Sequence, residues 1–119
     1  MIIRNFSDVE PFPLEATGQV GRVMIGPKEG AQTFVMRVFE FIEPGICYGP
    51  GTVDWEFEIL ILNGKGVVLS DGDKEYEVGP MDFVYAAPNE VFGIKATGTD
   101  LFRFLCTVPI RGNFFTDYK

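Results

Sequence analysis

The chain has 119 residues, a length that suits one domain with a single buried core. Seventeen acidic residues against ten basic ones give a net charge of −7, and no cluster of Lys or Arg could neutralise several phosphates, so we expect no nucleic-acid partner. No apolar run is long enough to span a bilayer, and residues 1–4 lead into polar residues rather than a signal-type apolar region. We therefore expect a cytoplasmic protein that does not bind membranes.

The composition favours an all-β fold. Twelve Phe and four Tyr residues, with many Val and Ile residues, favour strands over helices. Turn-forming pairs such as Gly26-Pro27, Asn63-Gly64 and Gly79-Pro80 recur about every eight to twelve residues, which is typical of short strands in a sandwich or barrel. No linker divides the chain, so residues 1–119 are predicted to form one domain, with a barrel core at about residues 20–110.

Eight strands are predicted between these turns. In chain order they span residues 19–25, 33–42, 56–62, 66–70, 75–78, 82–86, 91–96 and 101–108. Asp71-Gly72 predicts a hairpin between the fourth and fifth strands, because Gly accepts the positive φ that a tight turn requires. No segment has sustained helical periodicity, and residues 114–118 are predicted to form one helical turn at most.

Alternation along the last strand assigns its faces. Arg103 and Thr107 suit solvent, which directs Phe102, Phe104 and Cys106 to the other side.

A charge interrupts the apolar face of the second strand. Val35, Arg37, Phe39 and Phe41 share one face by the same alternation, and Arg37 is the single charge in that row. We interpret Arg37 as a residue that a binding cavity would use. Two alternatives stay open from sequence: this face lies at a subunit interface, or Arg37 pairs with a carboxylate at the barrel rim.

The two cysteines, Cys47 and Cys106, are too few for a disulfide framework or a thiolate metal cage, and we expect reduced thiols. The chain contains no histidine, the side chain that most often binds transition metals and that titrates near neutrality. Much metal and acid–base chemistry is therefore closed to it.

The segment from Gly45 to Gly64 has the spacing of a metal-binding β-barrel motif without its ligands. The pattern is glycine, five residues, His-x-His, three or four residues, Glu or His, six residues and glycine, and it resembles the first signature of the cupin family. The three ligand positions carry Gly51, Val53 and Phe57.

A second cupin signature aligns less closely with residues 81–96. It places Met81 and Asn89 at two glycine positions, Ala87 at a proline and Phe92 at the histidine. Asn89 is a sensible substitute, since Asn tolerates the left-handed conformation that glycine would adopt.

The resemblance implies a double-stranded β-helix, the cupin or jelly-roll barrel of two antiparallel sheets, commonly as a homodimer. Residues 34–39, 54–58 and 104–109 look more narrowly like a branch of single-domain cupins with four-histidine manganese sites. The corresponding positions here are Gly51, Val53, Phe57 and Phe92. A divalent ion placed against two phenyl rings without anionic ligands would lose more solvation energy than the protein could return. We therefore expect no metal and no other cofactor.

Carboxylates close in sequence could restore a site only if they faced inward. Glu56 and Glu58 flank Phe57, so in a regular strand they face outward when Phe57 faces inward. A bulge near Trp55 is the alternative that would turn one of them inward.

Three functions remain open on the sequence. The first is a metal-free module that binds a small, largely apolar organic molecule, with Tyr85 and Arg37 as polar groups. The expected ligand-binding residues are Arg37, Trp55, Phe57, Phe92, Phe104 and Cys106. The second is a cofactor-independent isomerase, epimerase or lyase, with Cys106, Arg37 and Tyr85 as catalytic candidates. Other groups that could transfer protons are Tyr48, Asp54 and Glu58. The third is a structural or dimerisation scaffold with a filled core.

Overall fold

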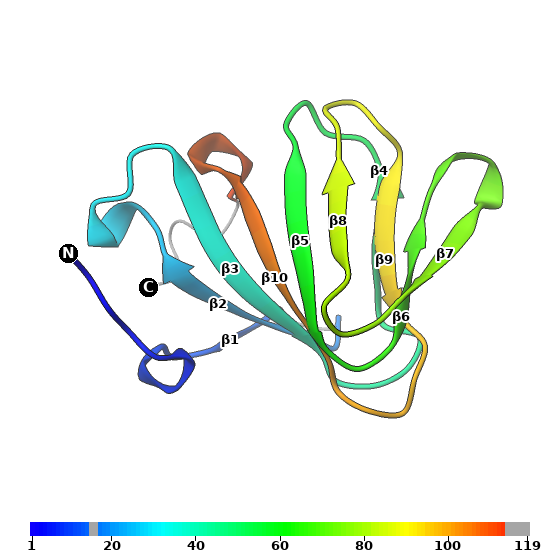
Figure 1. Cartoon of the computed structure of the whole chain (residues 1–119), viewed down its shortest axis with the longest axis horizontal. Helices are drawn as coiled ribbons and strands as arrows, with labels where there is room; N and C mark the ends of the chain where they lie inside the picture. Colours follow the sequence, from blue (N-terminus) through cyan, green and yellow to red (C-terminus); the bar gives the residue numbers. More distant parts are fainter. Residues whose placement is uncertain (15–16, 114–119) are drawn as a thin grey trace.

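The computed structural model describes residues 1–14 and 17–113, and within them ten strands form two antiparallel sheets (Figure 1). The strands are β1 (Phe12–Leu14), β2 (Gln19–Ile25), β3 (Phe34–Phe41), β4 (Cys47–Gly51), β5 (Phe57–Asn63), β6 (Gly66–Leu69), β7 (Glu75–Val78), β8 (Phe83–Ala86), β9 (Phe92–Ala96) and β10 (Phe102–Pro109). The described residues also form four short 3-10 helices: η1 (Phe6–Asp8) before β1, η2 (Pro27–Glu29) between β2 and β3, η3 (Asp71–Asp73) between β6 and β7, and η4 (Ile110–Gly112) after β10.

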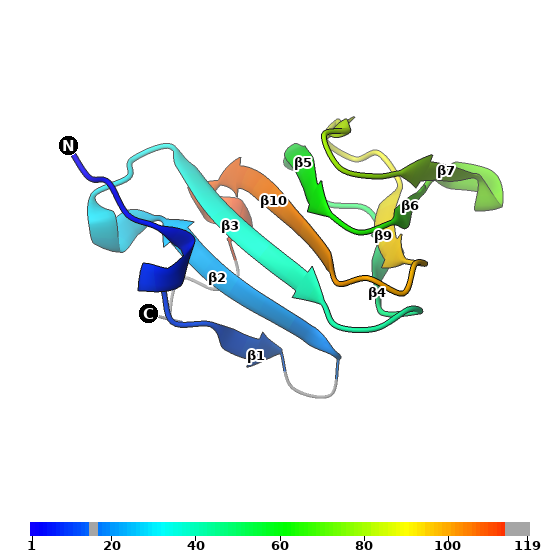
Figure 2. The same ribbon diagram turned by 60° about the horizontal axis from the view of Figure 1, so that its bottom comes forward.

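The two sheets face each other and enclose the core (Figure 2). The larger sheet has the order β1-β2-β3-β10-β5-β8, and the smaller has the order β4-β9-β6-β7. Strands distant in sequence are neighbours, since β10 pairs with both β3 and β5. This is the predicted all-β architecture of two antiparallel sheets.

Alternation along β10 has the predicted faces. Phe102, Phe104 and Cys106 are buried between the sheets, whereas Arg103 and Thr107 are half-buried on the outer face. The rings of Phe102 and Phe104 contact Phe41 of β3 edge-on, with centroids 6.0 and 5.3 Å apart. Aromatic packing of this kind stabilises the core beyond the area that it buries.

The N-terminal segment covers part of the outer face of the larger sheet, which the strand pattern did not predict. Phe6 of η1 lies under two guanidinium groups, with the Arg22 carbon 4.0 Å and the Arg103 carbon 4.8 Å from its ring centre. Both arginines also bind Glu40, at 2.7 Å from Arg22 and 2.6 Å from Arg103. Val38 and Glu40 are both buried, although they lie opposite the cavity face of β3, and the two arginines cover the Glu40 carboxylate.

All eight predicted strands exist, and each end lies within one residue of the prediction. The hairpin between β6 and β7 is also confirmed, but its loop is longer than a two-residue turn, and Gly72 and Asp73 both have positive φ. Asn89 adopts the expected left-handed conformation with φ of 66°. The segment 114–118 lies outside the described residues.

Two strands were not predicted. β1 is only three residues long. β4 consists of Cys47-Tyr48-Gly49-Pro50-Gly51, whose glycines and proline indicate a turn; it is a strand because it pairs with β9, opposite Lys95 and Ile94. Here tertiary pairing overrides local preference.

Candidate functional site

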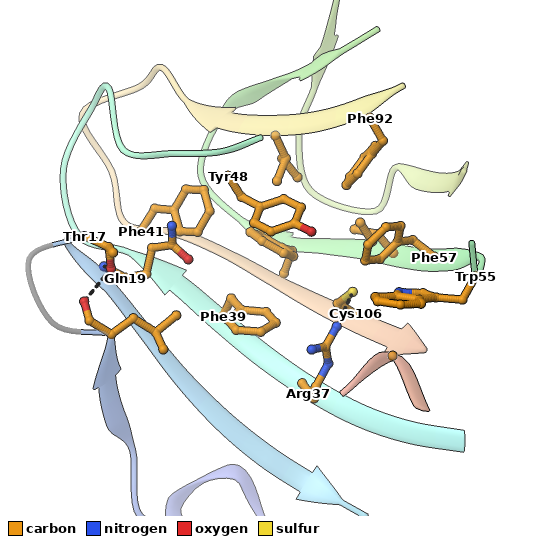
Figure 3. A pocket seen from close by; sticks show the side chains of 15 residues that line it. Thr17, Gln19, Arg37, Phe39, Phe41, Tyr48, Trp55, Phe57, Phe92 and Cys106 are labelled. Carbon is orange, nitrogen blue, oxygen red and sulfur yellow. Dashed lines mark hydrogen bonds between the residues drawn. The ribbon is translucent and has the colours of Figure 1, made fainter. Parts of the chain in front are cut away.

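A cavity of about 300 Å³ lies between the two sheets (Figure 3). Its volume is at the lower end of the range of about 300–1,000 Å³ that ligand pockets occupy. The wall is mostly aromatic and aliphatic, and all six residues expected to bind a ligand line it: Arg37, Trp55, Phe57, Phe92, Phe104 and Cys106. The structure thus brings together residues from β3, β5, β9, β10 and the loop before β5.

Arg37 and Cys106 form a polar pair in this wall. Arg37 is only 4% exposed, and its Nη2 donates a hydrogen bond to the Cys106 Sγ at 3.2 Å. The two residues are direct cross-strand partners of β3 and β10, which fixes the contact. Burial raises the pKa of the Cys106 thiol, and the Arg37 charge offsets that rise only in part. The thiol is therefore protonated at neutral pH.

Tyr48 adds a hydroxyl group to the same region. Its ring centre lies 6.3 Å from that of Phe57 and 6.4 Å from that of Phe92, and its hydroxyl points along the cavity toward Cys106 (Figure 3). Burial, and then the neighbouring Cys106 thiol, raise the pKa of Tyr48, while the Arg37 charge lowers it. The phenol stays protonated at neutral pH and can donate a hydrogen bond.

The other end of the cavity is formed by residues at the β1–β2 turn. Leu14, Thr17 and Gln19 line it. The Gln19 side-chain amide donates to the Cys47 carbonyl at 3.3 Å, and the Thr17 hydroxyl donates to the Leu14 carbonyl. The Gln19 bond ties the start of β2 to β4, and Leu14, Thr17 and Gln19 are all uncharged.

Trp55 lines the cavity, and η4 lies against its indole ring. A β-carbon added at Gly112 would lie 2.7 Å from the Trp55 Nε1, so only glycine permits this contact. Arg111 of the same turn lies over the indole at 5.8 Å and forms an ion pair with Asp54 at 2.7 Å.

Solved structures with the same architecture resemble this chain, although no protein-family model and no curated protein sequence matches it. The polyketide cyclase RemF from Streptomyces resistomycificus is 27% identical over 92% of this chain and 80% of its own, with a TM-score of 0.83. A cupin 2 domain-containing protein from Halorhodospira halophila is 30% identical over 82% of this chain and 68% of its own, with a TM-score of 0.72.

The chain is a cupin.

A predicted oxalate decarboxylase from Thermotoga maritima shares the fold at a TM-score of 0.76, with 22% identity over 92% of this cupin and 98% of its own chain. The family assignment confirms the double-stranded β-helix expected from the two signatures. No helix in the described part of this cupin is long and apolar enough to cross a membrane.

The positions expected from the resemblance to correspond to manganese ligands do not suit a metal ion. The rings of Phe57 and Phe92 lie 5.0 Å apart and are tilted by 31°, and a phenyl group cannot coordinate a cation as an imidazole does. Gly51 offers no side chain, and Val53 packs against the core. Across residues 1–14 and 17–113, no group of three or more His, Cys, Asp or Glu side chains could hold a metal.

Three polar candidates from the sequence lie away from this cupin's cavity. Tyr85 is exposed on the outer face of β8 and donates its hydroxyl to Glu56, so the expectation that it faces a ligand inside is not met. The hydrogen bond to Glu56 raises the pKa of Tyr85. Glu58 is exposed, as predicted from the inward position of Phe57, and Asp54 is exposed in its pair with Arg111.

Sequence reasoning left nine of the described cavity residues out of its expected binding set. They are Leu14, Thr17, Gln19, Phe39, Phe41, Tyr48, Ile59, Ile94 and Gly112. Tyr48 was considered only for proton transfer, because its surroundings predicted a loop. The pairing of Glu58 with Tyr85 would have placed Tyr85 correctly, since cross-strand partners share a face and Glu58 was assigned outward.

Proposed function

We propose that this cupin binds a small, largely apolar organic molecule in the cavity between its sheets, without a metal ion. The observation that carries the proposal is a cavity of about 300 Å³ whose wall is aromatic and aliphatic, with a few polar groups. Pockets that bind small molecules have this composition: an apolar wall that provides affinity and a few polar groups that orient the ligand. A scaffold with a filled core would not leave this space.

A ligand should stabilise the protein against heat. We expect one or more of indole, toluene and 2-naphthalenemethanol to raise the melting temperature. At a hundred times its dissociation constant, such a ligand adds about 2.7 kcal/mol to the free energy of unfolding. Differential scanning fluorimetry over a concentration series measures the effect.

A matched pair of variants on β5 separates the cavity from the surface. Ile59 lines the cavity and is buried, whereas Leu62 on the same strand is exposed. Ile59→Phe fills part of the cavity and should reduce the ligand-induced shift, while Leu62→Phe should leave it unchanged. The proposal fails if no probe stabilises the wild-type protein, or if both variants respond alike.

Catalysis without a cofactor is the second candidate, favoured by the similarity to RemF, which is a polyketide cyclase. An isomerase, epimerase or lyase reaction needs a group in the cavity that exchanges a proton near neutral pH. Cys106 and Tyr48 both have raised pKa values and hold their protons there. Binding is therefore the better supported function.

A further inference from the structure

The Tyr48 side chain brings into the cavity a hydroxyl group that no described residue uses. Tyr48 lies on β4 opposite Ile94 of β9, and its hydroxyl points along the cavity toward Cys106 (Figure 3). Among the residues that the structure describes, none donates a hydrogen bond to this hydroxyl or accepts one from it. A ligand that displaces water from such a group without replacing the hydrogen bond loses affinity.

The ring that carries this hydroxyl has a defined position. Its centre lies 6.3 Å from that of Phe57 and 6.4 Å from that of Phe92, and the pairing with Ile94 holds its backbone. Burial raises the pKa of Tyr48, so the phenol keeps its proton at neutral pH. The hydroxyl is therefore a hydrogen-bond donor already in place before a ligand binds, which reduces the entropy lost on binding.

The other polar groups on this side of the cavity also favour a ligand that accepts hydrogen bonds. Arg37 and Trp55 carry N–H donors and no side-chain acceptor, and the Cys106 sulfur already accepts from Arg37. No Asp or Glu is among the described residues that line the cavity, so a ligand amine would meet no carboxylate there. Thr17 and Gln19, whose side-chain oxygens could accept, lie at the other end.

The rest of the wall suits a planar ring. Phe57 and Phe92 form one tilted pair with ring centres 5.0 Å apart. Phe39 and Phe104 form another, with ring centres 5.8 Å apart. Aromatic rings gain from offset or edge contacts with such walls beyond the area they bury. A ligand that uses both features carries an aromatic ring and an oxygen that accepts hydrogen bonds.

We propose that the ligand is an aromatic carbonyl compound, a ketone or an aldehyde, whose carbonyl oxygen accepts a hydrogen bond from the Tyr48 hydroxyl. This inference rests on the proposed function and narrows it to one chemical class. A carbonyl joined to a ring accepts hydrogen bonds and donates none, and it keeps the molecule flat. It is also uncharged, so it does not lose the hydration of an ion when it enters a largely apolar wall.

The test uses acetophenone and α-methylstyrene, which share one planar shape and differ only in a carbonyl oxygen against a methylene group. Their affinities are measured by isothermal titration calorimetry at neutral pH. Tyr48→Phe should weaken the binding of acetophenone about threefold to tenfold, because it removes one hydrogen bond. The affinity for α-methylstyrene should stay nearly unchanged, because the variant keeps the aromatic ring.

Tyr85→Phe is the matched control. It removes a hydroxyl on the outer face of β8 that donates to Glu56, and it should change neither affinity. An equal loss of affinity for both probes in Tyr48→Phe would mean that the variant disturbs the wall as a whole, and the assigned hydrogen bond would be wrong.

A spectroscopic measurement reports on the hydrogen bond directly. The NMR resonance of the carbonyl carbon in isotope-labelled acetophenone moves downfield when the oxygen accepts a hydrogen bond. The bound ketone should therefore resonate further downfield in the wild-type protein than in Tyr48→Phe. The same resonance position in both proteins would contradict the proposal.

The outcomes separate the two proposals. If α-methylstyrene binds the wild-type protein and Tyr48→Phe leaves the affinity for acetophenone unchanged, the carbonyl proposal is overturned and the apolar binding function stands. Tighter binding of benzoate, the ionised analogue of the same shape, than of acetophenone also overturns the carbonyl proposal. Failure of every probe to bind overturns both.

Discussion

Gly64→Ala is expected to lower the free energy of unfolding by about 4 kcal/mol or more. Single substitutions cause losses this large only at strained backbone positions or in disrupted cores. Gly64 has φ of 81° at the end of β5, where a residue with a β-carbon loses about 1–2 kcal/mol. A β-carbon there would also lie 2.4 Å from the Leu101 carbonyl oxygen and 3.0 Å from the Phe102 Cα. Both contacts are to backbone at the start of β10, which cannot rotate away. Urea denaturation followed by Trp55 fluorescence measures the loss.

Gly45→Ala is the matched control. Gly45 has a similar φ of 92°, but a β-carbon added to it would meet nothing within 4 Å. Its substitution should therefore lose only the conformational part, about 1–2 kcal/mol. Equal losses in the two variants would show that the close approach of β10 contributes nothing.

Glu40→Gln is expected to lower the free energy of unfolding by about 3 kcal/mol, because it leaves two arginines without the carboxylate that both bind. The Glu40 side chain is 11% exposed, with Arg22 at 16% and Arg103 at 32%. Breaking buried pairs typically costs about 3–5 kcal/mol, and the partial exposure of Arg103 places this one at the lower end.

Asp54→Asn supplies the exposed comparison. Its nitrogen–oxygen distance to Arg111 is 2.7 Å, the same as between Arg22 and Glu40, but the two side chains are 59% and 69% exposed. Exposed pairs contribute about 0–1 kcal/mol, so this variant should unfold at nearly the wild-type urea concentration. A loss from Glu40→Gln no greater than that from Asp54→Asn would contradict the role assigned to burial.

Acid should weaken the wild-type protein through the same group. Burial alone would raise the pKa of Glu40, but the hydrogen bonds and charges of Arg103 and Arg22 outweigh it and hold that pKa below the ordinary value of 4.5. The folded state then binds fewer protons than the unfolded state, so this stabilisation is complete above the unfolded pKa and is lost as the pH falls through the folded one. Urea denaturation at pH 7 and at pH 3 should show that acid lowers the free energy of unfolding less in Glu40→Gln than in the wild-type protein. An equal decrease in both proteins would exclude Glu40 as the source of the pH dependence.

Alternation was sufficient to predict much of this molecule. Period-two patterns on β3 and β10 placed Arg37 and Cys106 on the inner face, because neighbouring side chains in a strand must point to opposite sides. The spacing of glycines between Gly45 and Gly64 predicted the family, and the inward position of Phe57 followed from it.

What the sequence did not predict depends on contacts distant along the chain. β4 is extended because it pairs with β9. Since β4 was not predicted, the position of Tyr48 in the cavity could not be predicted either. The ion pairs of Glu40 likewise join β3 to Arg22 of β2 and Arg103 of β10, and Phe6 packs against both arginines, which no local pattern encodes. The contact between Arg37 and Cys106 could be inferred only once β3 and β10 were known to be neighbours.

Because Phe6 packs against both Arg22 and Arg103, the choice of where to begin a recombinant chain affects the stability of the fold. Residues 1–3 project into water, so an affinity tag fused ahead of them would not disturb the barrel. Trimming the chain past Phe6 would instead admit solvent to the Glu40 carboxylate and convert its buried ion pairs into weak surface ones. Expression clones of this cupin should begin before that phenylalanine.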